Sequence, residues 1–157
     1  MLVLTGVFEA RAGSGTLSTS LSRSGQFTAS FPPALTLPTK FTPPPGDYMR
    51  LEPAFLVVSC DRIKEALYRD LGLAWSWRGK IYLRLHTARS ADEIVTIVSE
   101  KMPSGWNYRV ELPDVIEQRR YVRAIVQVLL MEVASRDAGS RPAEIPAWLA
   151  EGLAPDM

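Results

Sequence analysis

The sequence predicts an α+β fold, in which a small, mostly antiparallel sheet has one helix before it and two packed helices after it. Three observations support this prediction. Residues 51–73 carry apolar side chains every three or four positions, as an amphipathic helix does. Residues 80–86 and 94–112 are apolar, alternating or β-branched, as strands are. Residues 114–136 then return to helical spacing. Strands grouped between helices are typical of the α+β class.

Length and composition limit the classes of protein that the chain can belong to. A chain of 157 residues predicts one domain with a sizeable core. The net charge of +1 gives no reason to expect nucleic acid as a partner. No stretch approaches the roughly 18 apolar residues that a membrane-spanning helix needs. The single cysteine, Cys60, rules out an internal disulfide bond.

Residues 1–25 are expected to be a flexible leader, with the folded domain spanning 26–157. Residues 13–25 are rich in Gly, Ser and Thr. A short apolar piece precedes Ala10-Arg11-Ala12, which fits the end of a secretion signal that begins upstream of Met1. This interpretation predicts export to the periplasm or the cell exterior. The alternatives are a frayed first strand and a cytoplasmic protein.

The first elements follow from proline placement and apolar spacing. Residues 26–30 are a short strand candidate, and residues 31–53 hold seven of the twelve prolines, which predicts an extended connection. The helix over 51–73 has Pro53 in its first turn and Gly72 at its C-terminal end. Its expected buried stripe consists of Leu56, Cys60, Ile63, Leu67 and Leu71. Cys60 is therefore expected to be a buried small side chain rather than a nucleophile.

The strands are predicted from alternation and turn residues. Residues 80–86 alternate cleanly, with the only histidine, His86, on the polar face. A loop is expected over 87–93. Residues 94–99 and 106–112 flank the turn at 102–105 and predict a β-hairpin.

The last two helices follow the hairpin. Asp114 and Glu117 are spaced as a capping box for a helix over 114–136. Between residues 124 and 134 only Gln127 and Glu132 are polar, so this helix is expected to be central, with the sheet on one flank and the last helix on the other. A polar loop over 137–144 leads to the final helix, which starts at Pro146.

A motif in the final helix carries a resemblance to a known family. Residues 145–154 read I-P-A-W-L-A-E-G-L-A. This segment resembles the W-L-x-E-G-x-A helix of gluzincin-type zinc peptidases (the peptidase MA-like group), whose glutamate binds zinc. The resemblance implies a zincin-like fold and equates Glu151 with that ligand. It also places Gln127, Val128 and Met131 on the first histidine, the glutamate and the second histidine of the preceding His-Glu-x-x-His helix. The family domain continues past this helix, so a C-terminally incomplete domain is implied.

The chemistry of that site is missing from the chain. With one histidine in total, no two-histidine zinc site can be built. Glutamine and a thioether are poor zinc ligands, and Val128 cannot move a proton. The resemblance therefore implies no zinc cofactor and no catalysis by the family mechanism. Each residue also has a structural interpretation. The 145–154 motif can be a simple helix start, Gln127 can bond to backbone, Met131 can fill core, and Glu151 can pair with Arg120 or Arg123.

Three functions remain open at this stage. The resemblance implies an inactive domain that binds a peptide or protein along a sheet edge beside the former metal helix. The alternatives are an active hydrolase completed by missing C-terminal residues or a partner chain, and a structural component of an assembly. Trp75, Trp77 and Trp148 are candidate binding aromatics, although packing on the first helix is the favoured interpretation for Trp75 and Trp77. The Gly-x-Ser-x-Gly, Walker and Gly-x-Gly-x-x-Gly motifs are absent from the sequence.

Overall fold

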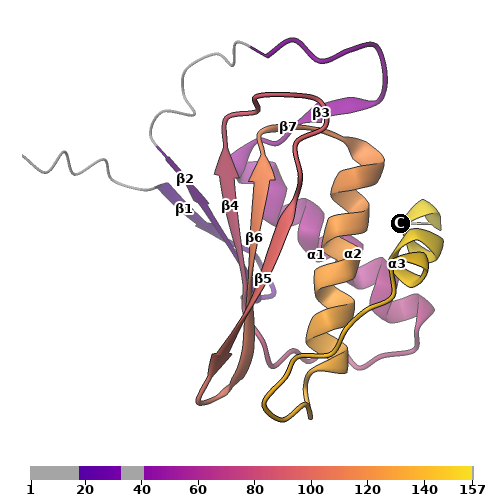
Figure 1. Ribbon diagram of the computed structural model, residues 1–157. Coiled ribbons are helices and arrows are strands. Elements are labelled where there is room, and N and C mark those ends of the chain that lie inside the picture. The colour runs from indigo at the N-terminus through magenta and orange to yellow at the C-terminus, as the bar shows by residue number, and fades with distance from the viewer. Residues whose placement is uncertain (1–17, 33–40, 157) are drawn as a thin grey trace, which may run out of the picture.

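Five strands form the main sheet in the order β1-β2-β4-β6-β5 (Figure 1). The computed structural model describes residues 18–32 and 41–156. The sheet strands are β1 (Ser18–Leu21), β2 (Phe27–Phe31), β4 (Ile81–His86), β5 (Thr96–Met102) and β6 (Gly105–Pro113). A second, two-stranded sheet pairs β3 (Tyr48–Arg50) with β7 (Val115–Glu117). The predicted α+β class is confirmed.

Strand direction is mixed within the main sheet. β2 pairs with β4, and β4 with β6, in parallel, whereas the outer pairs β1–β2 and β5–β6 are antiparallel. The expected hairpin is present, with Met102 opposite Gly105 across a two-residue connection. Its second strand inserts between β4 and β5, so β6 runs parallel to β4. The expectation of a mostly antiparallel sheet thus misses the parallel centre, because it assumed that strands adjacent in sequence pair with each other.

All three α-helices lie on one side of the sheet (Figure 1). They are α1 (Pro53–Asp70), α2 (Gln118–Ala134) and α3 (Ala147–Leu153), and a 3-10 turn, η2 (Ala154–Asp156), follows. α2 lies between the sheet and α3, as expected for the central helix. The expectation that one helix precedes the sheet is not met, because β1, β2 and β3 come before α1 in the chain. None of the helices in the described part of the chain is long and apolar enough to cross a membrane.

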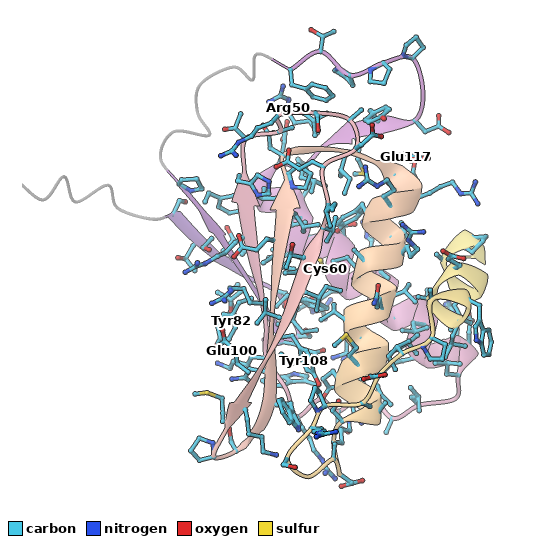
Figure 2. The ribbon with its side chains drawn as sticks, viewed as in Figure 1. Arg50, Cys60, Tyr82, Glu100, Tyr108 and Glu117 are labelled. Carbon is cyan, nitrogen blue, oxygen red and sulfur yellow. The ribbon has the colours of Figure 1, made fainter. Side chains whose placement is uncertain are left out.

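The core fills the space between the sheet and the first two helices. Alternation places Ile81, Leu83 and Leu85 of β4 toward the helices, where all three are buried. Figure 2 shows Tyr108 on this face, whereas Tyr82 and Glu100 lie on the opposite face, turned away from the helices. The α1 stripe is buried at Leu56, Cys60, Ile63 and Leu67, but Leu71 is exposed. The helix ends before Leu71, and Gly72 follows in the left-handed conformation expected at a helix C-terminus.

The start of α2 corrects the sequence prediction. Asp114 does not cap the helix, which begins only at Gln118 after Glu117, and neither residue makes a side-chain cap. Residues 115–117 pair instead with β3, since Val115 and Ile116 are β-branched and gain burial there. The Asp114 carboxylate accepts the amide of Ala88 at 2.7 Å and lies 3.4 Å from Arg50. This places Asp114 in the junction between the two sheets.

The expected domain boundary at residue 26 also changes. Residues 18–21 of the expected leader form β1, and Ser24 binds the carboxylate of Asp61 on α1 through its hydroxyl and its amide. The secretion-signal interpretation concerns residues 1–15, which lie outside the described residues. The expected extended connection, 31–53, contains β3, and its residues 33–40 are not described.

Candidate functional site

Strand β5 and helix α2 form the two sides of a groove that contains part of the predicted site. We call it the β5 groove, and its volume is about 260 Å³. One wall consists of residues 94, 95 and 97, at and just before the start of β5. The other side is the outward face of α2. The residues lining the β5 groove are Ile94, Val95, Ile97, Arg120, Arg123, Ala124 and Gln127.

A larger cavity of about 640 Å³ lies next to the β5 groove at the start of α2. It is lined by the first turns of α2 and by Glu151 and residues 154 and 155 at the C-terminal end of the chain. Arg120 and Arg123 line both hollows. We refer to these two neighbouring hollows, which share the two arginines, as the depression along α2.

The three α2 positions that the resemblance equates with the peptidase motif differ in their surroundings. Gln127 is half-buried and lines the β5 groove. Met131 is half-buried against the core, and its carbonyl oxygen accepts a hydrogen bond from the hydroxyl of Tyr108 at 3.0 Å. Val128 is 0% exposed and belongs to the core. Gln127 is thus the residue of the three that lines this depression.

Glu151 projects from α3 and has an arginine as its partner. Its Oε1 lies 3.0 Å from Nη1 of Arg123, and both side chains are about half exposed (55% and 45%). From the sequence, the expected partner of a buried Glu151 is Arg120 or Arg123. The partner is Arg123, and the pair is at the surface.

Arg120 instead fixes the loop that precedes β5. Its two terminal nitrogens donate to the carbonyl oxygens of Ala91 and Glu93, at 2.7 and 2.5 Å. The Glu93 carboxylate in turn accepts the amide of Arg89 at 2.9 Å and lies 2.6 Å from Nε2 of His86. These contacts hold the loop whose end, Ile94 and Val95, forms the wall of the β5 groove.

The electrostatics of Glu93 reflect these contacts. Burial raises the pKa of its carboxyl, but the hydrogen bonds from Arg89 and His86 and the positive charge of Arg89 outweigh it. The net result is a pKa below the usual value. Glu93 is therefore ionised at neutral pH and serves as the acceptor at the centre of the loop.

The candidate aromatic residues do not come together as one binding surface. Trp75 packs edge-on against Tyr68 of α1 with ring centroids 6.1 Å apart, and Trp77 donates its indole N–H to Ser24 at 2.9 Å. Both tryptophans belong to the connection between α1 and β4. The packing interpretation expects both to pack on α1, and the contact with Tyr68 places Trp75 there, whereas the indole of Trp77 is bonded to Ser24. Trp148 is exposed at the start of α3 and is absent from the lining of the depression.

Sequence reasoning missed a buried polar cluster at the opposite end of α2. Glu132 is 2% exposed, and its Oε1 accepts the amides of Arg78 and Gly79 at 2.8 and 3.0 Å. Its Oε2 accepts from Arg136 at 2.9 Å and from the hydroxyl of Tyr68 at 3.2 Å. The spacing of Glu132 and Arg136, four apart on an apolar helix, was the available signal. The cluster ties α2 to α1 and to the residues before β4.

Lys64 lies beside this cluster and was also missed. It is 0% exposed, and its ammonium group lies 4.9 Å from the ring centroid of Trp75 and 5.2 Å from that of Tyr68. Within the described residues it has no hydrogen-bond acceptor. Burial lowers the pKa of Lys64, while Asp61 and Glu132 oppose that shift. Lys64 lines neither hollow of the depression along α2, and its side chain is fully buried.

The thiol of Cys60 is shielded from solvent. Cys60 is fully buried, and burial raises the pKa of its thiol to about 12, so no thiolate forms at neutral pH. Across residues 18–32 and 41–156, no three His, Cys, Asp or Glu side chains converge as metal ligands do.

Comparisons of the chain with protein-family models, with curated proteins and with solved structures give no match.

Proposed function

We propose that this protein is a catalytically inactive, peptidase-like domain that binds an extended peptide or protein segment along strand β5. The observation that carries the proposal is the β5 groove. An outer strand of the sheet lies there beside a helix whose Gln127 occupies a position that the resemblance assigns to a metal ligand. A ligand strand could pair with β5 and direct alternate side chains into the groove.

Strand β5 has the features that such pairing requires. It lies at the end of the strand order, and its partner in the described sheet is β6. The exposed backbone of an outer strand is a template for another strand. Its far end is less accessible, because Lys101 is tied to the carbonyl oxygens of Ala138 and Gly139 at 3.4 and 3.0 Å. Binding is therefore expected at residues 94–99.

The absence of catalysis is argued from the side chains at the former motif positions. The amide of Gln127 and the thioether of Met131 bind zinc poorly, and buried Val128 offers no base. A peptide held in the β5 groove would meet an amide, a guanidinium and alkyl groups. These groups can recognise a ligand, but none of them activates water.

The proposal is tested by selecting binders from a displayed library of random peptides and mapping the complex by hydrogen exchange. The expected result is slower exchange of amides in residues 94–99, with residues 18–21 of the opposite edge unchanged. Replacing Ile94, which is 79% exposed on the groove wall, by Ser should weaken binding roughly fivefold or more. Leu21→Ser removes a similar exposed side chain from β1 and should leave affinity unchanged. Protection on β1 alone, or equal effects of the two variants, would refute the proposal.

Metal analysis and a broad peptidase assay separate this proposal from the active-hydrolase alternative. The expected result is no turnover and no stoichiometric zinc. Stoichiometric zinc that is lost on Gln127→Ala would overturn the inactive-domain proposal, since Gln127 would then be a ligand.

A further inference from the structure

The charged side chains that line the β5 groove are all positive. Its lining includes two arginines, Arg120 and Arg123, and no acidic residue. The contacts of Arg120 go to carbonyl oxygens, which leave its positive charge uncancelled. The remaining lining is alkyl apart from the amide of Gln127. A ligand in this groove is therefore favoured if it brings a carboxylate.

Arg123 is placed to receive that carboxylate. Its hydrogen bond to Glu151 uses one nitrogen, Nη1, while a guanidinium carries five N–H donors. Arg123 lines both the β5 groove and the larger cavity, and it also pairs with Glu151. Because its side chain is 45% exposed, a ligand can reach it without unfolding of the protein.

Glu151 occupies Arg123 in the structure as a ligand carboxylate would. An ion pair with both members about half exposed is weak, so it can be exchanged for a better-placed acceptor. A ligand strand that carries a carboxylate and pairs with β5 gains backbone hydrogen bonds as well. Glu151 is thus a weak internal competitor that neutralises Arg123 when the groove is empty.

We propose that the β5 groove selects extended peptides in which an acidic group points at Arg123, and that Glu151 competes with this group. The inference rests on the proposed function and adds the chemical class of the ligand. The carboxylate can belong to an Asp or Glu side chain or to a peptide C-terminus, since both present the same acceptor to a guanidinium. Arg120 acts as a positioning residue through the loop at 91–93.

The test uses mixtures of N-acetylated, C-amidated hexapeptides in which one position at a time is fixed as Asp, Asn or Lys. We expect one position at which Asp mixtures bind about tenfold more tightly than Asn mixtures. This preference should disappear in Arg123→Gln and weaken as salt screens the charges. In Glu151→Gln the affinity for Asp mixtures should rise about twofold to fivefold. Arg62→Gln is the matched control, because Arg62 is an exposed arginine on α1 and lines neither the β5 groove nor the larger cavity.

The outcomes are distinguishable. Equal binding of Asp and Asn mixtures, or an Arg123→Gln protein with unchanged preference, overturns this inference while leaving the proposed function in place. Absence of binding by any mixture, together with unchanged exchange of the β5 amides, refutes the proposed function itself. Peptides whose only carboxylate is a free C-terminus test its source. If these bind best and depend on Arg123, the inference holds with the terminus as the recognised group.

Discussion

Nη1 of Arg123 lies 3.0 Å from Oε1 of Glu151, so the residue that resembles a third zinc ligand has a cation of the protein itself as its partner. Arg123 is one helical turn before Gln127 on α2. A positive guanidinium therefore stabilises the carboxylate on α3 that a metal ion would stabilise in the resembling family. The carboxylate of Glu151 therefore has a positive partner within the protein itself.

Introducing two histidines at positions 127 and 131 tests whether these positions correspond to a metal site. In Gln127→His/Met131→His, two imidazoles would stand four apart on α2, with Glu151 as the third donor. We expect the variant to bind about one zinc ion per chain, since an exposed Arg123–Glu151 pair is weak enough to yield. Adding Glu151→Ala should weaken zinc binding by roughly tenfold or more. Isothermal titration with zinc measures both, and equal affinity with and without Glu151 would contradict the assigned geometry.

The sequence allowed the elements to be predicted more reliably than their contacts. Alternation over 80–86 and 106–112 identified β4 and β6, because one face of each strand is buried. The parallel pairing of these strands depends on where the hairpin inserts, which local pattern does not encode. Asp114 was misplaced because a capping residue and a strand-end acid share the same local signature. Only folding brought Asp114 to the amide of Ala88.

In the candidate site, too, single residues were predicted better than the contacts between elements. The spacing of Gln127 and Glu151 followed from the motif, and the named arginine partner Arg123 followed from the need to balance a carboxylate. The β5 groove could not be predicted, because it depends on how closely β5 and α2 pack, which local sequence patterns do not specify. Lys64 and Glu132 were missed as a unit because their proximity arises from the packing of α1 on α2.

Glu132 is expected to be a major contributor to stability. Replacement by Ala removes the acceptor of two backbone amides and leaves Arg136, whose side chain is 17% exposed, without its charge partner. Breaking such a buried pair costs roughly 3–5 kcal/mol. Asp137→Ala, which breaks an exposed pair with Arg78, should cost less than about 1 kcal/mol. Urea denaturation measures both changes, and similar losses for the two variants would disagree with this account.

Gly79 is expected to tolerate no side chain. A Cβ at this position would collide with the carbonyl oxygen of Trp106 and crowd the Glu132 side chain. Overpacking against backbone gives an expected loss of about 1–3 kcal/mol or more for Gly79→Ala. At Gly139 an added Cβ meets nothing within 4 Å, so Gly139→Ala should be close to neutral. Thermal unfolding of both variants tests the difference, and an unaltered midpoint for Gly79→Ala would be inconsistent with the structure.

Lys64 is expected to reduce stability at neutral pH. Burial lowers its pKa below the usual 10.5, so the folded protein holds this proton less tightly than the unfolded chain does. Lys64→Met keeps the volume, removes the buried charge and should stabilise the protein at pH 7. The wild type gains stability as pH rises toward 10.5, and the advantage of the variant should shrink there. A constant advantage between pH 7 and 10.5 would argue against a buried charge as the cause.

Glu93 links acidity to the loop that forms the wall of the β5 groove. Its pKa is lower in the folded protein than the usual 4.5, so its contribution to stability is fully present above that value. The contribution is lost as pH falls below 4.5 through the folded pKa, because the protonated carboxyl is a weaker acceptor for Arg89 and His86. Glu93→Gln should therefore cost roughly 1–2 kcal/mol at pH 7, and the gap to wild type should close on acidification. Asp92→Asn, an exposed neighbour in the same loop, should show no such gap. Urea denaturation between pH 3 and 7 measures the two variants, and a Glu93→Gln gap that stays constant over this range would exclude the carboxylate as the group that holds the loop.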